Sequence, residues 1–344
     1  MADIEKRLNK SAWKKASAWG TEIDPNAAGN GILPLNAGAI KQAIAMIPEE
    51  SPVSAFESDL DLGDFDPVDF SLEFDARYEG LGPIVAQVFG AAGAPSTPEG
   101  TARLHTLTLA NTIAALFGTY ATEKHDKYHV VPSAKPYKLT FTMDGGKLKL
   151  TVDLKGDKVI DDSAIVTTLA SVTVPDKHNR VLKKQLVFRM NAQAGDALDG
   201  DDAIKVKNFT LEIERKPEGG EHEGGSDSII EALEEGKIAI KLTLELNRMD
   251  NVNDVYFGDW TSENEKKADL IFTGALITGT SYYFFKFEFP RLKIEDVDYP
   301  DENIIPATIT LRGLEADAAP TGMSGITKPV QLKVQNKRTA DMLA

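Results

Sequence analysis

Histidine has the widest chemical range of the residues in this chain, because imidazole binds metal ions and transfers protons near neutral pH. His125 and His129 are four residues apart, and on a helix this spacing would place both rings on one face, where they could share a metal ion. Their segment, KHDKYHVVP, runs into a proline and has no helical periodicity. We therefore expect a solvated loop here and predict no metal site.

Two acidic segments contain the carboxylate oxygens that Ca²⁺ prefers as ligands. The first is GDALDGDDAI at residues 195–204, and it lacks the spacing that ends in a bidentate glutamate. The second segment contains Asp59, Asp61, Asp64, Asp66 and Asp69. We expect both segments to be solvated or to contact another subunit.

Enzyme signatures are missing from the sequence. It has no P-loop, no GxGxxG after a predicted strand, no HExxH and no GxSxG. An acidic β protein always offers carboxylate pairs of the glycosidase kind. Sugar sites also need clustered aromatic side chains, and here Trp13, Trp19 and Trp260 are scattered. We predict no catalytic, cofactor-binding or metal-binding residue, and we do not expect an enzyme.

The run YYFFKF at residues 282–287 has aromatic side chains of the kind on which nucleic acid bases stack. It lacks the surrounding lysines and arginines that hold the phosphate backbone. We therefore expect a core strand with aromatic side chains on both faces, covered for example by a helix and a neighbouring subunit.

Composition narrows the class of protein. The chain has 344 residues, of which 42% are hydrophobic, enough for two or three domains with sizeable cores. It has no cysteine and therefore no disulfide or thiolate chemistry. A net charge of −15 does not suit a protein that grips nucleic acid phosphates. No apolar run approaches the ~20 residues of a membrane span, and the N-terminus lacks the apolar region of a signal peptide, so no membrane binding is expected.

One sequence motif occurs twice in the chain. Residues 65–81 are FDPVDFSLEFDARYEGL, and residues 204–219 are IKVKNFTLEIERKPEG. Both contain an Asx-Phe-Ser/Thr-Leu-Glu centre, and both end in a basic residue and a turn. A repeated strand unit predicts a duplicated β domain, which is more typical of an assembling building block than of a single catalytic pocket.

Period-2 alternation of apolar residues dominates the rest of the chain and predicts strands. The clearest are a hairpin over residues 139–154 around Asp144-Gly145-Gly146 and a strand over residues 238–246. Residues 281–289 and 291–297 are expected as separate strands. Short helices are predicted at residues 39–47, 84–89 (between Pro83 and Gly90) and 227–235.

These elements predict a mainly β fold with two tandem β-sandwich or barrel domains, each with a short flanking helix. We expect an N-terminal arm at residues 1–50, a first β domain at 51–175, a second at 176–315 and a C-terminal arm at 316–344. Both arms are rich in glycine, proline and small residues.

Several segments, in this order, resemble those of tail tube proteins of long-tailed bacteriophages, the larger duplicated kind. The similarity covers most of the chain. The segments are SAWGTEIDPNAAGNGILPLNAGAI (17–40), VDFSLEFDARYEGLGPIVAQVFGAAG (68–93), TARLHTLTL (101–109), KADLIFTGALITGTSYYFFKFEFPRLKIEDVDYP (267–300) and IIPATITLRGLEA (304–316).

The resemblance implies a structural subunit of the phage tail tube (major tail protein), a virion component assembled in the bacterial host cytoplasm. Such subunits close into rings that stack around a channel for genome passage. A duplicated chain implies a ring of three copies with pseudo-sixfold symmetry, with a hexamer as the alternative. Implied partners are further copies, the tape measure, terminator and distal tail proteins, and double-stranded DNA that passes without specific binding. The family has no catalytic residues to carry over.

Two physical arguments agree with this resemblance. Residues 70–78 and 238–246 alternate polar and apolar, as strands that line a water-filled channel must. An acidic lining would repel phosphates, a hypothesis that a predominantly basic lining would contradict. The alternatives are another tail protein, such as a terminator or baseplate component, a β-sandwich carbohydrate or cell-surface binding module, and an enzyme with an unrecognised site.

Overall fold

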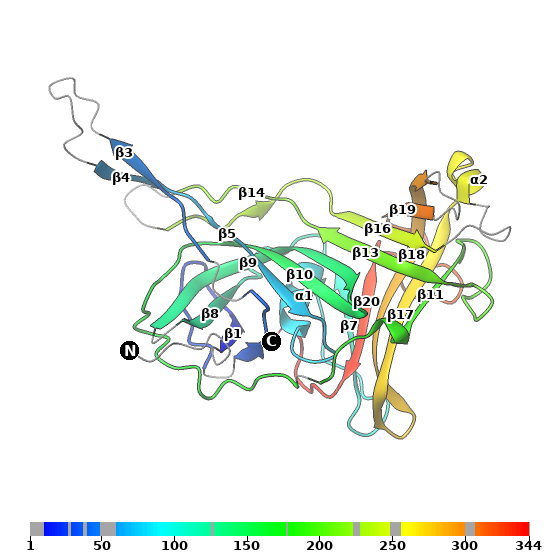
Figure 1. Ribbon diagram of the computed structural model, residues 1–344, viewed down its shortest axis with the longest axis horizontal. Coiled ribbons are helices and arrows are strands. Elements are labelled where there is room, and N and C mark those ends of the chain that lie inside the picture. The colour runs from blue at the N-terminus through cyan, green and yellow to red at the C-terminus, as the bar shows by residue number, and fades with distance from the viewer. Residues whose placement is uncertain are drawn as a thin grey trace.

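The computed structural model describes residues 10–26, 29–36, 40–48, 60–124, 127–176, 178–222, 228–247, 256–299 and 307–343. The fold is mainly β, as predicted. Sixteen of the described strands form one antiparallel sheet that folds over itself (Figure 1). The described strands form no closed barrel, so the sandwich expectation holds and the barrel alternative does not.

The first half of the chain pairs its strands in the order β2–β1–β8–β9–β10–β5. A short strand β6 and strand β7 lie outside this order. A projecting hairpin, β3–β4, precedes β5. The bounds are β1 (Ser11–Lys15), β2 (Asn30–Ile32), β3 (Ile44–Pro48), β4 (Leu60–Phe65), β5 (Val68–Asp75), β6 (Gly90–Ala91), β7 (Arg103–Leu109), β8 (Gly118–Lys124), β9 (Lys127–Asp144) and β10 (Lys147–Gly156).

The second half pairs its strands in the matching order β12–β11–β17–β18–β19–β16. Strand β13 joins the halves, because it lies between β9 and β16. Strand β20 joins them again, between β18 and β7. The bounds are β11 (Leu186–Ala192), β12 (Ala203–Ile204), β13 (Val206–Glu214), β14 (Pro217–Glu218), β15 (Leu233–Glu234), β16 (Ala239–Leu246), β17 (Lys266–Thr278), β18 (Ser281–Asp298), β19 (Ala307–Gly313) and β20 (Gln331–Asn336), with a 3₁₀ turn η2 (Lys183–Gln185) before β11.

The halves also share their irregularities. The β8–β9 ladder shifts register between Val131 and Ala134, and the β17–β18 ladder shifts between Phe289 and Leu292. Each shift includes a proline, Pro132 in the first half and Pro290 in the second. A bulge tolerates proline because no ladder N–H is required there. A second shift follows in each long strand, at residue 137 of β9 and residue 295 of β18.

These matching positions correct the alignment of the repeated phrase. Strand β5 occupies the position of β16, so VDFSLEF (68–74) corresponds to IKLTLEL (240–246). Strand β13 corresponds instead to residues 34–36 and 40–43, which lie along the outer edge of β5. At that edge Pro34 bridges Phe74, as Val206 pairs with Leu246. The sequence similarity of β5 and β13 arises because both are half-buried strands of one layer.

Seven strands form what we call the first layer, in the order β5–β10–β9–β13–β16–β19–β18. Its inner face carries continuous rows of buried apolar side chains. Against them packs what we call the second layer, in which β11, β17, the first part of β18, β20 and β7 pair in this order. Phe141 of β9, for example, stacks edge-on against Phe287 of β18 with ring centroids 5.0 Å apart. One complete row consists of Phe74, Leu150, Phe141, Leu211, Leu242, Leu311 and Ile294.

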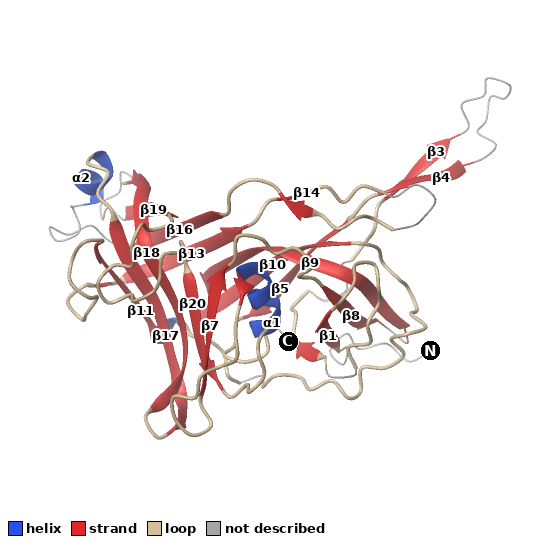
Figure 2. Cartoon of the chain, turned by 180° about the vertical axis from the view of Figure 1, so that it is seen from behind, coloured by secondary structure: helices blue, strands red, loops and turns tan. Residues whose placement is uncertain are grey.

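Helix α1 (Gly82–Phe89) confirms the helix predicted between Pro83 and Gly90. Gly90 ends it in the left-handed conformation (φ 82°), which favours glycine, and donates its N–H to Ala86 O. The helix contacts β7 and β9, and its side chains are buried between the layers (Figure 2). The other described helix is α2 (Tyr256–Thr261), which was not predicted.

Two helix predictions are wrong. Of residues 39–47, residues 44–47 belong to strand β3 and residue 39 lies outside the described residues. Of residues 227–235, residue 227 lies outside them and the rest form an extended segment that includes β15. Both segments lie in hairpins that extend from the first layer, where pairing with a partner strand outweighs a weak helical pattern.

The chain ends, predicted as arms, contribute strands to the sheet. Trp13 of β1 is fully buried, and its indole fills the space beside Gly118, where a Cβ would come within 2.6 Å of the ring. Strand β20 lies inside the second layer. The two predicted strands at 281–289 and 291–297 are one strand, β18, continuous through its bulge.

Candidate assembly surfaces

The described histidines and acidic segments lie in different parts of the structure. His129 lies in strand β9, with Nε2 2.8 Å from Asp161 Oδ1, and His125 lies outside the described residues. The loop after β11 folds onto itself, with Asp199 N–H donating to Asp202 Oδ2 (3.0 Å). Residues 60–65 form strand β4, and Asp59 lies outside the described residues. In the described part of the chain, no three His, Asp or Glu side chains are grouped to hold a metal ion.

The aromatic candidates are mostly core residues. In the 282–287 run, Tyr283, Phe285 and Phe287 are buried, whereas Tyr282 is 46% exposed. The prediction of a core strand is therefore right for one face of β18. The tryptophans do not share a surface: Trp13 is in the core, and Trp19 Nε1 donates to Ile229 O (2.5 Å).

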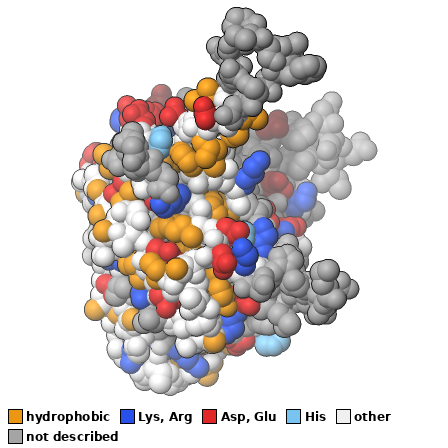
Figure 3. All heavy atoms as spheres, turned by 90° about the vertical axis from the view of Figure 1, so that its left-hand side faces the viewer, with side chains coloured by type: hydrophobic (Ala, Val, Ile, Leu, Met, Phe, Trp, Pro, Cys, Tyr) orange, Lys and Arg blue, Asp and Glu red, His pale blue; other side chains and the backbone are white. Residues whose placement is uncertain are grey.

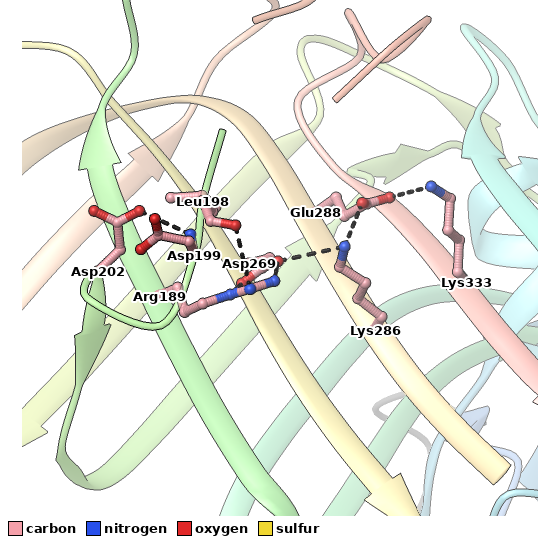
Figure 4. A network of polar contacts seen from close by, with 8 residues as sticks. All are labelled: Arg189, Leu198, Asp199, Asp202, Asp269, Lys286, Glu288 and Lys333. Carbon is pink, nitrogen blue, oxygen red and sulfur yellow. Dashed lines mark hydrogen bonds and ion pairs between the residues drawn. The ribbon is translucent and has the colours of Figure 1, made fainter. Parts of the chain in front are cut away.

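A buried ionic network crosses four strands of the second layer (Figure 4). Asp269 of β17 and Glu288 of β18 lie opposite each other and are almost fully buried. Lys286 Nζ bridges them at 3.3 and 2.7 Å. Arg189 of β11 binds Asp269 and Lys333 of β20 binds Glu288, and the Asp269 carboxylate raises the pKa of Arg189.

This network is structural, since each buried carboxylate has two cationic partners. Such pairing offsets the cost of burying like charges on neighbouring strands. The network ties strand β20 to β18 through Lys333 and Glu288.

The outer face of the first layer is polar and reaches solvent, and we call it the polar face. Side chains in register form continuous rows across all its strands, because successive residues of a strand alternate between faces. One such row consists of Glu73, Thr151, Thr140, Glu212, Lys241, Arg312 and Lys293. The next contains a ladder of threonines, Thr142, Thr210, Thr243 and Thr310.

Acidic side chains outnumber basic ones in these rows. The acidic residues are Asp69, Glu73, Asp75, Asp144, Asp153, Glu212, Glu214, Glu245, Asp296 and Asp298, and the basic residues are Lys135, Lys138, Lys147, Lys149, Lys155, Lys241, Lys293 and Arg312. Together with the hydroxyl ladder, they make the polar face a hydrated surface of mixed charge and slightly acidic balance. The face is not a basic groove of the kind that binds a nucleic acid backbone.

The joint between the halves is a strand-to-strand seam. Strand β8 pairs with β9 up to Ala134, and β13 then pairs with β9 from Lys138 to Thr142. Lys138 Nζ lies 3.3 Å from Glu212 Oε1 and 3.9 Å from Glu214 Oε2, across the seam. The seam therefore has a basic residue on β9 and acidic residues on β13.

Arg215, which follows β13 directly, stabilises this seam. Its guanidinium, 1% exposed, donates to the carbonyl oxygens of Val88 (2.6 Å), Phe89 (3.2 Å) and Ala110 (2.7 Å) and pairs with Glu234 (2.7 Å). Val88 and Phe89 are the last two residues of helix α1, so a residue of the second half caps a helix of the first. Burial lowers the pKa of the Arg215 guanidinium, and Glu234 opposes that effect.

The β14–β15 arm (residues 217–222 and 228–234) continues the seam over the first half. Lys135 of β9 is buried under it and donates to Glu231 Oε1 and Ala232 O, both at 2.8 Å. Ile229 N–H donates to Asp157 Oδ1 (2.8 Å). The sequence offered one signal for these contacts, a basic residue ending the phrase at position 215, but it did not show that the residue is buried.

The β3–β4 hairpin corresponds to the β14–β15 arm. His222 of that arm contacts Phe65 and Asp64 at the base of the hairpin, whereas apolar side chains further along it are exposed. Met46 pairs with Leu62, and they are 52% and 65% exposed. Ile47 (55%) and Leu60 (51%) are exposed as well. Figure 3 shows the end of the molecule where the hairpin lies, with hydrophobic side chains at the surface among charged ones. Exposed apolar side chains in such a projection are typical of a protein–protein contact.

Comparison with known proteins gives one family. A family model described as phage tail tube protein matches residues 9–334. No curated protein sequence matches the chain. Among the described residues, no helix is both long and apolar enough to cross a membrane.

Proposed function

The chain belongs to the phage tail tube protein family and is a structural subunit of the virion tail, and from this premise we propose that three copies close each ring of the tube. Self-assembly and contact with other tail proteins are the general behaviour of such a subunit. The proposal concerns the number of copies, the surface that lines the channel and the contacts between rings.

The repeated order of strand pairing carries this proposal. Both halves pair six strands in the same order and shift register at matching points. The halves of one chain are joined by β13 on β9 in a head-to-tail contact. If the same contact recurs between chains and closes, it generates a ring. Three chains then supply six similar units, which gives pseudo-sixfold symmetry.

We assign the polar face to the channel. The opposite face of the first layer is the hydrophobic core, so only the polar face can contact water. Its slightly acidic balance and its threonine ladder give no array of cations for phosphate oxygens. DNA is expected to pass this surface without specific binding.

The β3–β4 hairpin and the ring faces are the expected contacts with further copies and with the tape measure, terminator and distal tail proteins. The ring is expected to assemble in the cytoplasm of the bacterial host.

The test is the assembly state of the purified protein. Negative-stain microscopy is expected to show rings or tubes, and mass measurement of single rings is expected to give about three times 37.4 kDa. Rings of six chains would overturn the three-copy proposal but keep the tube function. A monomer at high protein concentration, without rings or tubes, would count against assembly by this chain alone.

The hairpin has its own test within this experiment. Met46→Asp together with Leu62→Asp is expected to abolish tubes and leave the unfolding transition unchanged, because both side chains are more than half exposed. Ile165→Asp, at 51% exposure on the first half, is the matched control and is expected to assemble normally. Tubes of normal length from the double variant would show that the hairpin is not a contact.

A further inference from the structure

The pairing of β13 with β9, which joins the two halves of the chain, can be compared with the corresponding edge of β18. On β9, the edge beyond the last β8 pair receives β13, and the buried Lys135 holds the β14–β15 arm. Both features have counterparts on β18. Its pairing with β17 stops at Leu292, just as the pairing of β9 with β8 stops at Ala134.

Beyond Leu292, β18 has a strand on one side only in the described part of the chain. Residues 293–298 pair with β19, and no described strand lies along their other edge. An unpaired edge of this kind is a template for a strand from another chain. Lys293 occupies on β18 the position of Lys135 on β9, since it pairs with Arg312 as Lys135 pairs with Lys155.

The two lysines differ in how they are covered. The Lys135 side chain is 1% exposed because the β14–β15 arm lies over it, whereas that of Lys293 is 32% exposed. Lys293 contacts Glu263, whose own side chain is 79% exposed, at 3.1 Å. The lysine position that the β14–β15 arm covers on β9 is therefore accessible to solvent on β18.

The matching donor lies at the opposite end of the first layer. Residues 34–36 and 40–43 occupy the position of β13, along the outer edge of β5: Leu35 N–H donates to Glu73 O (2.7 Å), and Asp66 N–H donates to Ala43 O (3.1 Å). They lead into the β3–β4 hairpin as β13 leads into the β14–β15 arm. Lys41 is exposed in this segment.

We propose that this edge of one copy pairs with the open edge of β18 in the next copy, and that its β3–β4 hairpin covers Lys293 there. The proposal rests on the ring assembly proposed above and names its seam. The two pairings are complementary in charge, but the basic and acidic sides are exchanged. Within the chain, the basic Lys138 of β9 faces the acidic Glu212 and Glu214 of β13. Between chains, Asp296 and Asp298 of β18 face Lys41.

The reversed sign also provides specificity. An acidic β13 brought to the β18 edge of another copy would meet Asp296 and Asp298, and like charges on adjacent strands disfavour pairing. The intrachain seam and the interchain seam are therefore not interchangeable, which favours ordered rings over irregular chains.

Disulfide trapping tests the seam, because the chain has no cysteine. Lys41→Cys combined in one chain with Asp296→Cys or with Asp298→Cys is expected to give covalent oligomers up to the closed ring under oxidation. Mixing the Lys41→Cys single variant with an Asp296→Cys or Asp298→Cys single variant is expected to give covalent dimers only. The control is Lys138→Cys with Glu214→Cys, Cα partners in the internal seam, which is expected to cross-link within one chain.

The outcomes separate the two proposals. Rings that form in the microscope without cross-links from either Lys41 pair, while the internal control oxidises, would overturn this seam and leave the ring assembly intact. A covalent dimer from Asp296→Cys or Asp298→Cys alone would show that β18 pairs with itself, which also overturns the seam. Absence of rings in the unsubstituted protein would instead refute the ring assembly.

A charge exchange gives an independent measurement. Lys41→Asp is expected to reduce tube yield at least tenfold, and Asp296→Lys with Asp298→Lys is expected to do the same. Combining all three substitutions is expected to restore assembly. Failure of the combined variant, with normal folding of each component, would contradict the pairing of these residues.

Discussion

Arg215 is the side chain whose removal should best separate the two halves of the chain. Arg215→Met keeps most of the apolar stem but deletes the guanidinium that caps helix α1 and pairs with Glu234. The carbonyl oxygens of Val88 and Ala110 then lose the guanidinium as donor, whereas that of Phe89 keeps the Ala110 N–H. The change acts on the joint and leaves the hydrophobic core of each half in place.

The magnitude follows from burial. Removing one partner of a buried ion pair costs about 3–5 kcal/mol, because the other charge is left without compensation. The Glu234 side chain is 14% exposed, so water relieves part of this cost, and we expect the free energy of unfolding to fall by about 3 kcal/mol. Adding Glu234→Gln should recover about 1 kcal/mol, because it removes the stranded charge.

Urea unfolding followed by tryptophan fluorescence measures this loss. Lys216→Met, one residue along and exposed, is the matched control and should change the free energy of unfolding by less than about 0.5 kcal/mol. A loss below about 1 kcal/mol for Arg215→Met would refute the argument, since it would mean that the buried guanidinium contributes no more than an ordinary hydrogen bond.

Three further predictions concern the core and one buried histidine, each measured by urea unfolding against the unsubstituted chain. Phe141 is buried between the two layers, and Phe141→Ala should lower the free energy of unfolding by about 3–5 kcal/mol. A loss under ~1 kcal/mol would show that neighbouring side chains move in to fill the cavity. Gly118→Ala should cost about 1–3 kcal/mol because its Cβ would meet the fully buried Trp13 ring, and a neutral effect would mean that the indole can move. Burial lowers the pKa of His105 below its ordinary 6.5, so the unfolded chain binds the proton first, and stability present above pH 6.5 is lost as the pH falls. His105→Gln, which can still donate to Arg338 O, should therefore lose less stability between pH 7.5 and pH 5.5; an equal loss would place the acid sensitivity elsewhere.

Local signals in the sequence were enough to predict helix α1 and the β9–β10 hairpin. Pro83 and Gly90 fix the ends of the helix through backbone geometry alone. Gly145 and Gly146, both at positive φ, fix the turn of the hairpin. Neither prediction depended on residues distant in the chain.

Predictions that depended on distant partners were wrong. Pro290 suggested a break between two strands, but β18 continues because the proline lies in a bulge that needs no donor. Residues 44–47 and 228–235 have weak helical spacing and become extended because they belong to paired hairpins. A local pattern does not show which strand lies opposite.

The assembly surfaces were predicted in kind but not in place. The alternation in residues 70–78 and 238–246 correctly indicated strands with one polar and one buried face. The repeated phrase pointed to two related halves but matched β5 to β13, which lie at different positions of the layer. Nothing in the phrase distinguished the buried Arg215 from an exposed turn residue, since burial depends on the α1 carbonyls that face it.

The position of β20 has a consequence for the timing of folding. This strand, residues 331–336 of 344, lies between β18 and β7 and carries Lys333 into the buried ionic network. During synthesis the first half can fold while the second half is still emerging from the ribosome, as chains generally fold from the N-terminus. The second layer is complete only after residue 336 has been synthesised. A truncated chain would leave an edge of β7 and an edge of β18 without their partner, so incomplete translation products should fail to fold stably and stay out of growing tubes.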